Sequence, residues 1–289
     1  MKTSTEIGSI AAYVGEAKAV EIVGKAGFDA WDFSMVDNMA IYDWENNRIK
    51  DAPHPLNQSE YLKFVRELKN IGEAYGMVCN QSHAPFPTDR MPLDIIKRSI
   101  ECTSEAGGSI CVIHPNALAS AEENAEYYMS ILPFAKEYGV KIATENMWDW
   151  KVGAPTSCFA ACSTSEDFVK HVDLVNDPYL IACLDIGHAE MKGSGSGAAN
   201  MIRALGYRLL ALHIHDNDLI DDAHQIPFSM SIDFVEIAKA LRDIDYSGYL
   251  TLEAINFLKK GDTESLLLGA KQLLESVKRL DKYIQEGVN

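Results

Sequence analysis

Short apolar segments alternate with amphipathic helical segments along the chain, and this alternation most constrains the fold. Eight such strand–helix units fit into the 289 residues. Strands that alternate with helices of this kind pair in parallel, because each helix carries the chain back to the start of the next strand. The pattern predicts an α/β protein with a single (β/α)8 TIM barrel over residues 1–289. A doubly wound open sheet is the alternative, but no Gly-x-Gly-x-x-Gly nucleotide loop follows the first predicted strand.

The predicted elements follow from period and from glycine or polar boundary residues. Strands are predicted at 6–13, 30–34, 77–82, 109–113, 140–144, 178–185, 208–212 and 248–252. Helices are predicted at 16–26, 61–75, 93–106, 121–138, 165–175, 198–205, 233–244 and 263–285. Residues 37–58 show no period and are predicted to form a long loop, with Ser59 as the N-cap of the helix that follows.

Most of the predicted strands end in a carboxylate or an imidazole. In chain order these residues are His83, His114, Glu145, Asp185, the pair His213 and His215, and Glu253. Positions 83, 114, 145, 185, 215 and 253 are separated by 31, 31, 40, 30 and 38 residues, about one strand–helix unit each. Because the carboxyl ends of the strands of a parallel barrel meet on one face, we expect one site there rather than six unrelated helix caps.

Three carboxylates and one imidazole of this ring, from Glu145, Asp185, His215 and Glu253, predict a metal site. Converging carboxylates need a neutralising partner, and a divalent cation supplies the charge. Mixed oxygen and nitrogen ligands suit Mn²⁺, Mg²⁺, Co²⁺ or Zn²⁺. His213 and His215 point to the same side of an extended strand, so the sequence does not decide which of them binds.

Composition limits the partners. The chain has 42 Asp and Glu against 26 Lys and Arg, a formal net charge of −16. Such a field repels phosphate backbones, so we expect no nucleic-acid partner. The six cysteines form no CxxC pair, which is typical of reduced thiols in the cytosol. No secretory signal and no apolar run near the roughly 20 residues of a membrane span are found, so we expect a cytoplasmic protein without a membrane partner, and we leave homo-oligomerisation open.

The order of these motifs resembles the xylose-isomerase-like TIM-barrel superfamily, with its sugar phosphate isomerase/epimerase-like proteins. The motifs are His114-Pro, Glu145-Asn, Asp185-x-x-His188, His213-x-His-Asp-Asn, Asp222-x-His224 and the last-strand Glu253. The resemblance implies one metal on Glu145, Asp185, His215 and Glu253. It also implies that Glu145 and Glu253 flank the substrate carbon as catalytic acid and base, with His188 on a substrate oxygen.

The implied function is a metal-dependent isomerase or epimerase of a small sugar, a sugar phosphate or a hydroxy-ketone. One carboxylate would remove the proton beside the carbonyl to form a metal-held enediolate, and the same or the other carboxylate would return it. Loss of a hydroxyl instead would make the protein an inosose dehydratase-type lyase. The residues expected to contact the substrate are His83, His114, His188, His213, His224 and Trp148.

Two departures separate this chain from the ketose 3-epimerases of the superfamily. These carry an Arg six residues after the metal His, where this chain has Asp221, and a second Glu six residues after the first, where it has Lys151. Their substrate specificity is therefore not transferred.

Two other functions stay as alternatives. The first is an endonuclease IV-like multi-zinc hydrolase of abasic DNA, because that family's additional zinc ligands resemble His83, His114, His188, Asp222 and His224. The acidic balance and the missing glycine-rich opening signature argue against it. The second is a non-catalytic sugar-binding barrel, which predicts that one of the four metal ligands is missing, and none is.

Overall fold

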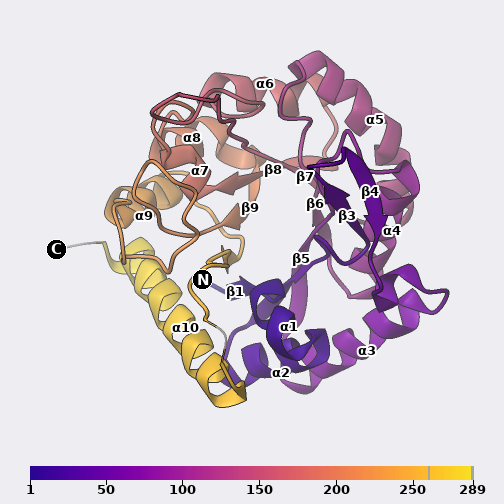
Figure 1. Ribbon diagram of the computed structural model, residues 1–289. Helices are drawn as coiled ribbons and strands as arrows, with labels where there is room; N and C mark the ends of the chain where they lie inside the picture. The colour runs from indigo at the N-terminus through magenta and orange to yellow at the C-terminus, as the bar shows by residue number, and fades with distance from the viewer. Residues whose placement is uncertain (260, 288–289) are drawn as a thin grey trace.

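Eight parallel strands form the central sheet of the computed structural model, which describes residues 1–259 and 261–287 (Figure 1). The strands are β1 (Thr3–Glu6), β2 (Ala30–Ser34), β5 (Val78–His83), β6 (Ile110–Val112), β7 (Lys141–Glu145), β8 (Leu180–Asp185), β9 (Leu209–His213) and β10 (Leu250–Leu252). They lie in the order β10-β1-β2-β5-β6-β7-β8-β9. Residues 260, 288 and 289, which the predicted 1–289 unit includes, lie outside the described residues.

The sheet closes into a barrel where its two edge strands meet. Ile214, just past β9, forms a parallel bridge with Leu252 of β10. Its amide donates to Thr251 O at 2.9 Å, and the Glu253 amide donates to Ile214 O at 3.0 Å. The predicted (β/α)8 barrel is therefore confirmed, and the closure brings the carboxyl ends of β9 and β10 side by side.

Helices surround the barrel, as Figure 1 shows. They are α2 (Glu16–Ala26), α3 (Tyr61–Ala74), α4 (Leu93–Glu105), α5 (Ala121–Glu137), α6 (Ser165–Val175), α8 (Ala198–Leu205), α9 (Phe234–Asp243) and α10 (Thr263–Glu286). Each begins within a residue or so of its predicted start. The start of α5 has a capping box, in which Ser120 and Glu123 each bond the other's backbone. None of the described helices is long and apolar enough to cross a membrane.

The predictions for the first strand, the loop and the helix cap are wrong. The strand expected at 6–13 ends at Glu6, and α1 (Gly8–Val14) follows it. A short apolar run fits both periods, and here the helical one prevails. The expected loop 37–58 contains an antiparallel hairpin of β3 (Ala40–Asp43) and β4 (Arg48–Asp51), and then a 3-10 turn, Pro55–Asn57. The N-cap of α3 is Glu60 rather than Ser59.

A short helix that was not predicted, α7 (Ile186–Glu190), follows β8 directly. The Asp185 side chain caps it by accepting from the His188 amide at 2.7 Å. Asp185 therefore has a structural role through one oxygen, and its other oxygen remains free for a second one.

Candidate active site and metal centre

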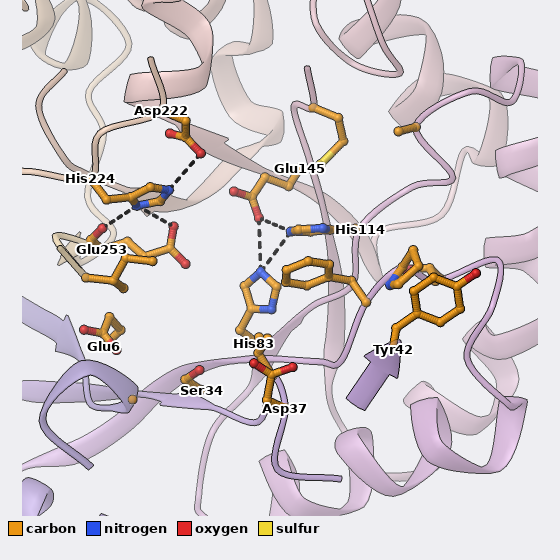
Figure 2. Close-up of a pocket in the computed structure, with 18 of the residues that line it drawn as sticks. Glu6, Ser34, Asp37, Tyr42, His83, His114, Glu145, Asp222, His224 and Glu253 are labelled. Atoms are coloured by element: carbon orange, nitrogen blue, oxygen red, sulfur yellow. Dashed lines mark hydrogen bonds and ion pairs between the residues drawn. The ribbon is translucent and has the colours of Figure 1, made fainter. Parts of the chain in front are cut away.

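A cavity of about 1280 Å³ opens at the carboxyl ends of the strands. Figure 2 shows carboxylate and imidazole side chains from several strand ends facing one another in this cavity. Of the residues predicted to act in catalysis or to contact substrate, those lining it are His83, His114, Glu145, Trp148, His188, His224 and Glu253. His213 does not line it, since it is fully buried beneath the cavity floor.

Four strand-end residues form a group at and just below that floor, here called the floor group: Glu145 and Glu253, which line the cavity, and Asp185 and His213, which are buried under it. Their potential ligand atoms lie within 4.8 Å of one another. Nδ1 of His213 is 3.0 Å from Glu145 Oε1 and 3.6 Å from Glu253 Oε2. Oδ2 of Asp185 is buried and has no hydrogen-bond partner among the described residues. The donor set and this free oxygen fit a divalent cation.

The imidazole in this group is His213, whereas the sequence interpretation assigned His215. Strand β9 ends at His213, and Ile214 already pairs with β10. Beyond the strand, Nε2 of His215 lies 3.0 Å from Asp185 Oδ1. Its ring packs against Gly187, where a Cβ would overlap it, and stacks on the His224 ring with centroids 3.8 Å apart. His215 thus contacts Asp185 at Oδ1, the oxygen that also caps α7, and leaves Asp185 Oδ2 free.

His215 belongs to a second group, with His188, Asp222 and His224, whose potential ligand atoms also lie within 4.8 Å of one another. Oδ2 of Asp222 is 3.2 Å from His188 Nε2 and 3.0 Å from His224 Nε2. Within the described part of the chain, Asp222 Oδ1 and His215 Nδ1 have no hydrogen-bond partner. This group has the composition of a second metal site.

His83 and His114 lie on the other side of Glu145. Nε2 of His114 is 3.2 Å from Glu145 Oε2 and 2.9 Å from His83 Nε2. His83, Glu145 and His213 form a third group of potential ligands. Glu145 is therefore shared between the floor group and this pair of histidines.

Three histidines are oriented in the same way by the backbone. Nδ1 of His83 bonds Ala84 O at 2.9 Å, Nδ1 of His188 bonds Asn146 O at 2.9 Å, and Nδ1 of His224 bonds Glu253 O at 2.7 Å. A carbonyl oxygen accepts only, so each Nδ1 is the protonated nitrogen. The Nε2 atom of each ring then faces the interior of the site, where His188 and His224 meet Asp222 and His83 meets His114.

The electrostatics of the site are governed by burial and by these carboxylate–imidazole contacts. Burial opposes ionisation of Glu145, but His213 and His114 outweigh it and hold the pKa of Glu145 well below its usual range. Burial lowers the pKa of His114 to about 4, so this ring is neutral at pH 7. For His224, the bond to Asp222 outweighs burial and raises the pKa to about 9.

Sequence reasoning gave no role to two polar residues of the site. Glu6, the last residue of β1, lines the cavity, and burial raises the pKa of its carboxyl to about 7. It carries the same strand-end signal as the others, but the misplaced first strand concealed it. Asn146 links β7 to β8, because its side chain donates to Asp185 O at 2.9 Å and accepts from the Asp185 amide at 2.8 Å.

Comparison with known proteins agrees with the fold. A family model described as xylose isomerase-like TIM barrel matches residues 20–282. The uncharacterised protein MJ1311 of Methanocaldococcus jannaschii is 24% identical over 278 residues, covering 90% of this chain and 85% of that protein. Fructoselysine 3-epimerase of Shigella flexneri is 24% identical over 218 residues, covering 72% of each.

Two solved structures share the architecture over nearly their whole length. A D-tagatose 3-epimerase-like protein has a TM-score of 0.69 at 21% identity, covering 98% of this chain and all of its own. The IOLI protein, crystallised with a zinc atom, has a TM-score of 0.68 at 20% identity, covering 98% of each chain. At these identities the likeness is one of fold.

Proposed function

Since this chain belongs to the xylose isomerase-like TIM barrel family, we propose that it is a sugar isomerase or epimerase that depends on a divalent metal. The observation that carries the proposal is the floor group of Glu145, Asp185, His213 and Glu253, with its free Asp185 oxygen, at the base of a substrate-sized cavity. The epimerases among the relatives and the zinc in the IOLI structure support it.

The floor group would hold the metal and the cavity would hold the sugar above it. When bound, a divalent metal supplies Lewis-acid polarisation of a substrate carbonyl. Glu145 and Glu253 both line the cavity and both lie within 3.6 Å of His213 Nδ1, so the two carboxylates approach the same point from different strands. One of them takes the proton from the carbon beside the carbonyl and the other returns a proton.

Other cavity residues would orient the substrate. His188, held through Asn146, directs Nε2 inward to meet a sugar oxygen. The Trp148 ring, 6.3 Å from the His188 ring, covers one side and helps to exclude water. His83 and His114 supply further polar atoms on the opposite side of Glu145. The return of the proton to the opposite face of the same carbon gives an epimer, and its return to the neighbouring carbon gives an isomer.

The charge of the cavity favours an unphosphorylated sugar. Of its described lining residues, Arg90 is the one Lys or Arg, and its Nε is already 3.0 Å from Asp89 Oδ2. A phosphate dianion would therefore meet carboxylates such as Asp37 and Asp149 without a free Lys or Arg partner. The cavity has room for a phosphate ester, so we infer that rejection would be electrostatic rather than steric.

We expect the wild-type protein, supplied with Mn²⁺ or Co²⁺ in deuterated water, to exchange a carbon-bound proton of at least one free ketose. Exchange should stop on chelation and be slower with the phosphate ester of the same ketose at equal concentration. NMR of a ketose panel measures both rates. A protein that exchanges no ketose with any metal would contradict the proposed activity, whereas faster exchange with the phosphate ester would contradict only the inferred preference.

A second candidate function, a multi-metal hydrolase, is favoured by the group of His188, His215, Asp222 and His224. This group and the His83–His114 pair could hold further zinc ions beside the floor group. The net charge of −16 opposes DNA binding. We expect no efficient incision of an abasic duplex at physiological salt, even after loading with zinc. Chelator-sensitive incision in a gel assay, together with more than one zinc per chain, would favour the hydrolase instead.

A further inference from the structure

A network of buried polar side chains crosses the interior of the barrel behind the floor group, and its last member, Asp32, also lines the cavity. Such barrels usually pack branched apolar side chains in their interior. Ser4 Oγ donates to Asn80 Oδ1 at 2.6 Å, and Asn80 Nδ2 donates to Thr251 Oγ1 at 3.0 Å. Thr251 Oγ1 donates to Gln81 Oε1 at 3.3 Å, and Gln81 Nε2 donates to Asp32 Oδ2 at 2.9 Å. These side chains come from four different strands, and each is at most 7% exposed.

The network ends at the back of His213. Oδ2 of Asp32 lies 3.4 Å from His213 Nε2, on the side of the ring opposite to Nδ1, which faces Glu145 and Glu253. Neither His213 Nε2 nor Asp32 Oδ1 has a hydrogen-bond partner among the residues described. Both side chains are at most 1% exposed, and leaving their polar atoms unsatisfied lowers the stability of the fold. A carboxylate at this position therefore calls for a functional reason.

We propose that Asp32, held in place by Gln81, is a positioning residue that fixes the His213 ring so that its Nδ1 can bind the metal. The inference rests on the proposed metal site. An imidazole ligand needs a free lone pair on the binding nitrogen, and an acceptor behind the other nitrogen keeps the proton there. The 3.4 Å separation between His213 Nε2 and Asp32 Oδ2 is only slightly longer than an ordinary N–H···O hydrogen bond.

The decisive experiment measures the affinity of the wild-type and Asp32→Asn proteins for Mn²⁺ by competition with a chelator. The amide keeps the shape of the carboxylate but removes its charge. We expect affinity to fall about 10–100-fold, the usual effect of losing a partner behind a metal ligand. The gain in melting temperature on adding Mn²⁺ should shrink accordingly. A purely structural Asp32 would lower the melting temperature equally with and without Mn²⁺, and this result would overturn the proposal.

Two further variants make the test specific. Glu6→Gln removes another buried carboxylate of the cavity without touching His213; compared above pH 8, where the Glu6 carboxyl is ionised, it measures the effect of charge alone and should cost less affinity than Asp32→Asn. Equal losses would overturn the proposal. Gln81→Leu should weaken Mn²⁺ binding by a smaller factor, because Asp32 keeps its charge but loses the hydrogen bond that holds it. Unchanged affinity in this variant would remove Gln81 from the proposal.

The same measurements separate failure of the metal site from failure of the role of Asp32. A wild-type protein that bound no Mn²⁺, Co²⁺ or Zn²⁺ would contradict the metal site itself. A wild type that binds the metal, beside an Asp32→Asn variant that binds it equally well, would contradict only the role of Asp32.

Discussion

Replacement of Glu145 or of Glu253 by glutamine is expected to abolish proton exchange into the substrate, even when excess metal salt keeps the site loaded. Glutamine keeps the size of the side chain but cannot take a proton at neutral pH. General acid–base groups contribute roughly 10²–10⁴-fold to rate, so each variant should lose at least two orders of magnitude. Deuterium incorporation into the ketose, followed by NMR, measures the loss directly.

The matched control for this prediction is His188→Ala. His188 lines the same cavity but contacts a substrate oxygen in the proposed arrangement, so its loss should mainly raise KM. Metal content is measured in each preparation, because Glu145 and Glu253 are also candidate ligands. Near wild-type exchange by both glutamine variants with metal bound would show that the carboxylate pair does not move the proton. His83, His114 and His224 would then be the groups to test.

The ring of strand-end residues could be predicted because barrel geometry converts position along the chain into position in space. Glu145 and Asp185 each end an apolar segment, and parallel pairing brings such ends to one face whatever the helices between them do. The same reasoning would have found Glu6, had the first strand been placed correctly. It was not, because Ile7 and Ile10 fit a helical spacing as well as a strand, and only the pairing of β1 with β10 and β2 resolves the choice.

Features that depend on a contact between distant segments could not be predicted from the sequence. His213 and His215 fall into different groups of potential ligands because Ile214 pairs with β10, which takes the chain out of the strand between them. The network behind His213 joins Asp32 to Gln81, which lie 49 residues apart and carry no motif. The hairpin Ala40–Asp51 has strands of four residues, too short for a period of two to stand out.

The second large expected effect is on metal affinity, and it follows from assigning His213 as the imidazole ligand. His213→Ala should lower affinity for Mn²⁺ by more than about 100-fold, beyond the range of supporting residues, because it removes the one nitrogen of the floor group. His215→Ala is the matched control, since it deletes the same ring two residues away. His215 touches the floor only through Asp185 Oδ1, so its loss should cost no more than a supporting contact does.

Chelator competition ranks the tightest site in the wild-type, His213→Ala and His215→Ala proteins, and anomalous diffraction from crystals soaked in Mn²⁺ places the ion. We expect the ion beside Asp185 Oδ2, the buried oxygen without a partner among the described residues, and we expect it to persist in His215→Ala. If His215→Ala loses the ion while His213→Ala retains it, the two histidines have the roles that the family resemblance implied. The tightest metal would then lie toward Asp222 and His224, and Glu145 would be free to act as a base without ligating it.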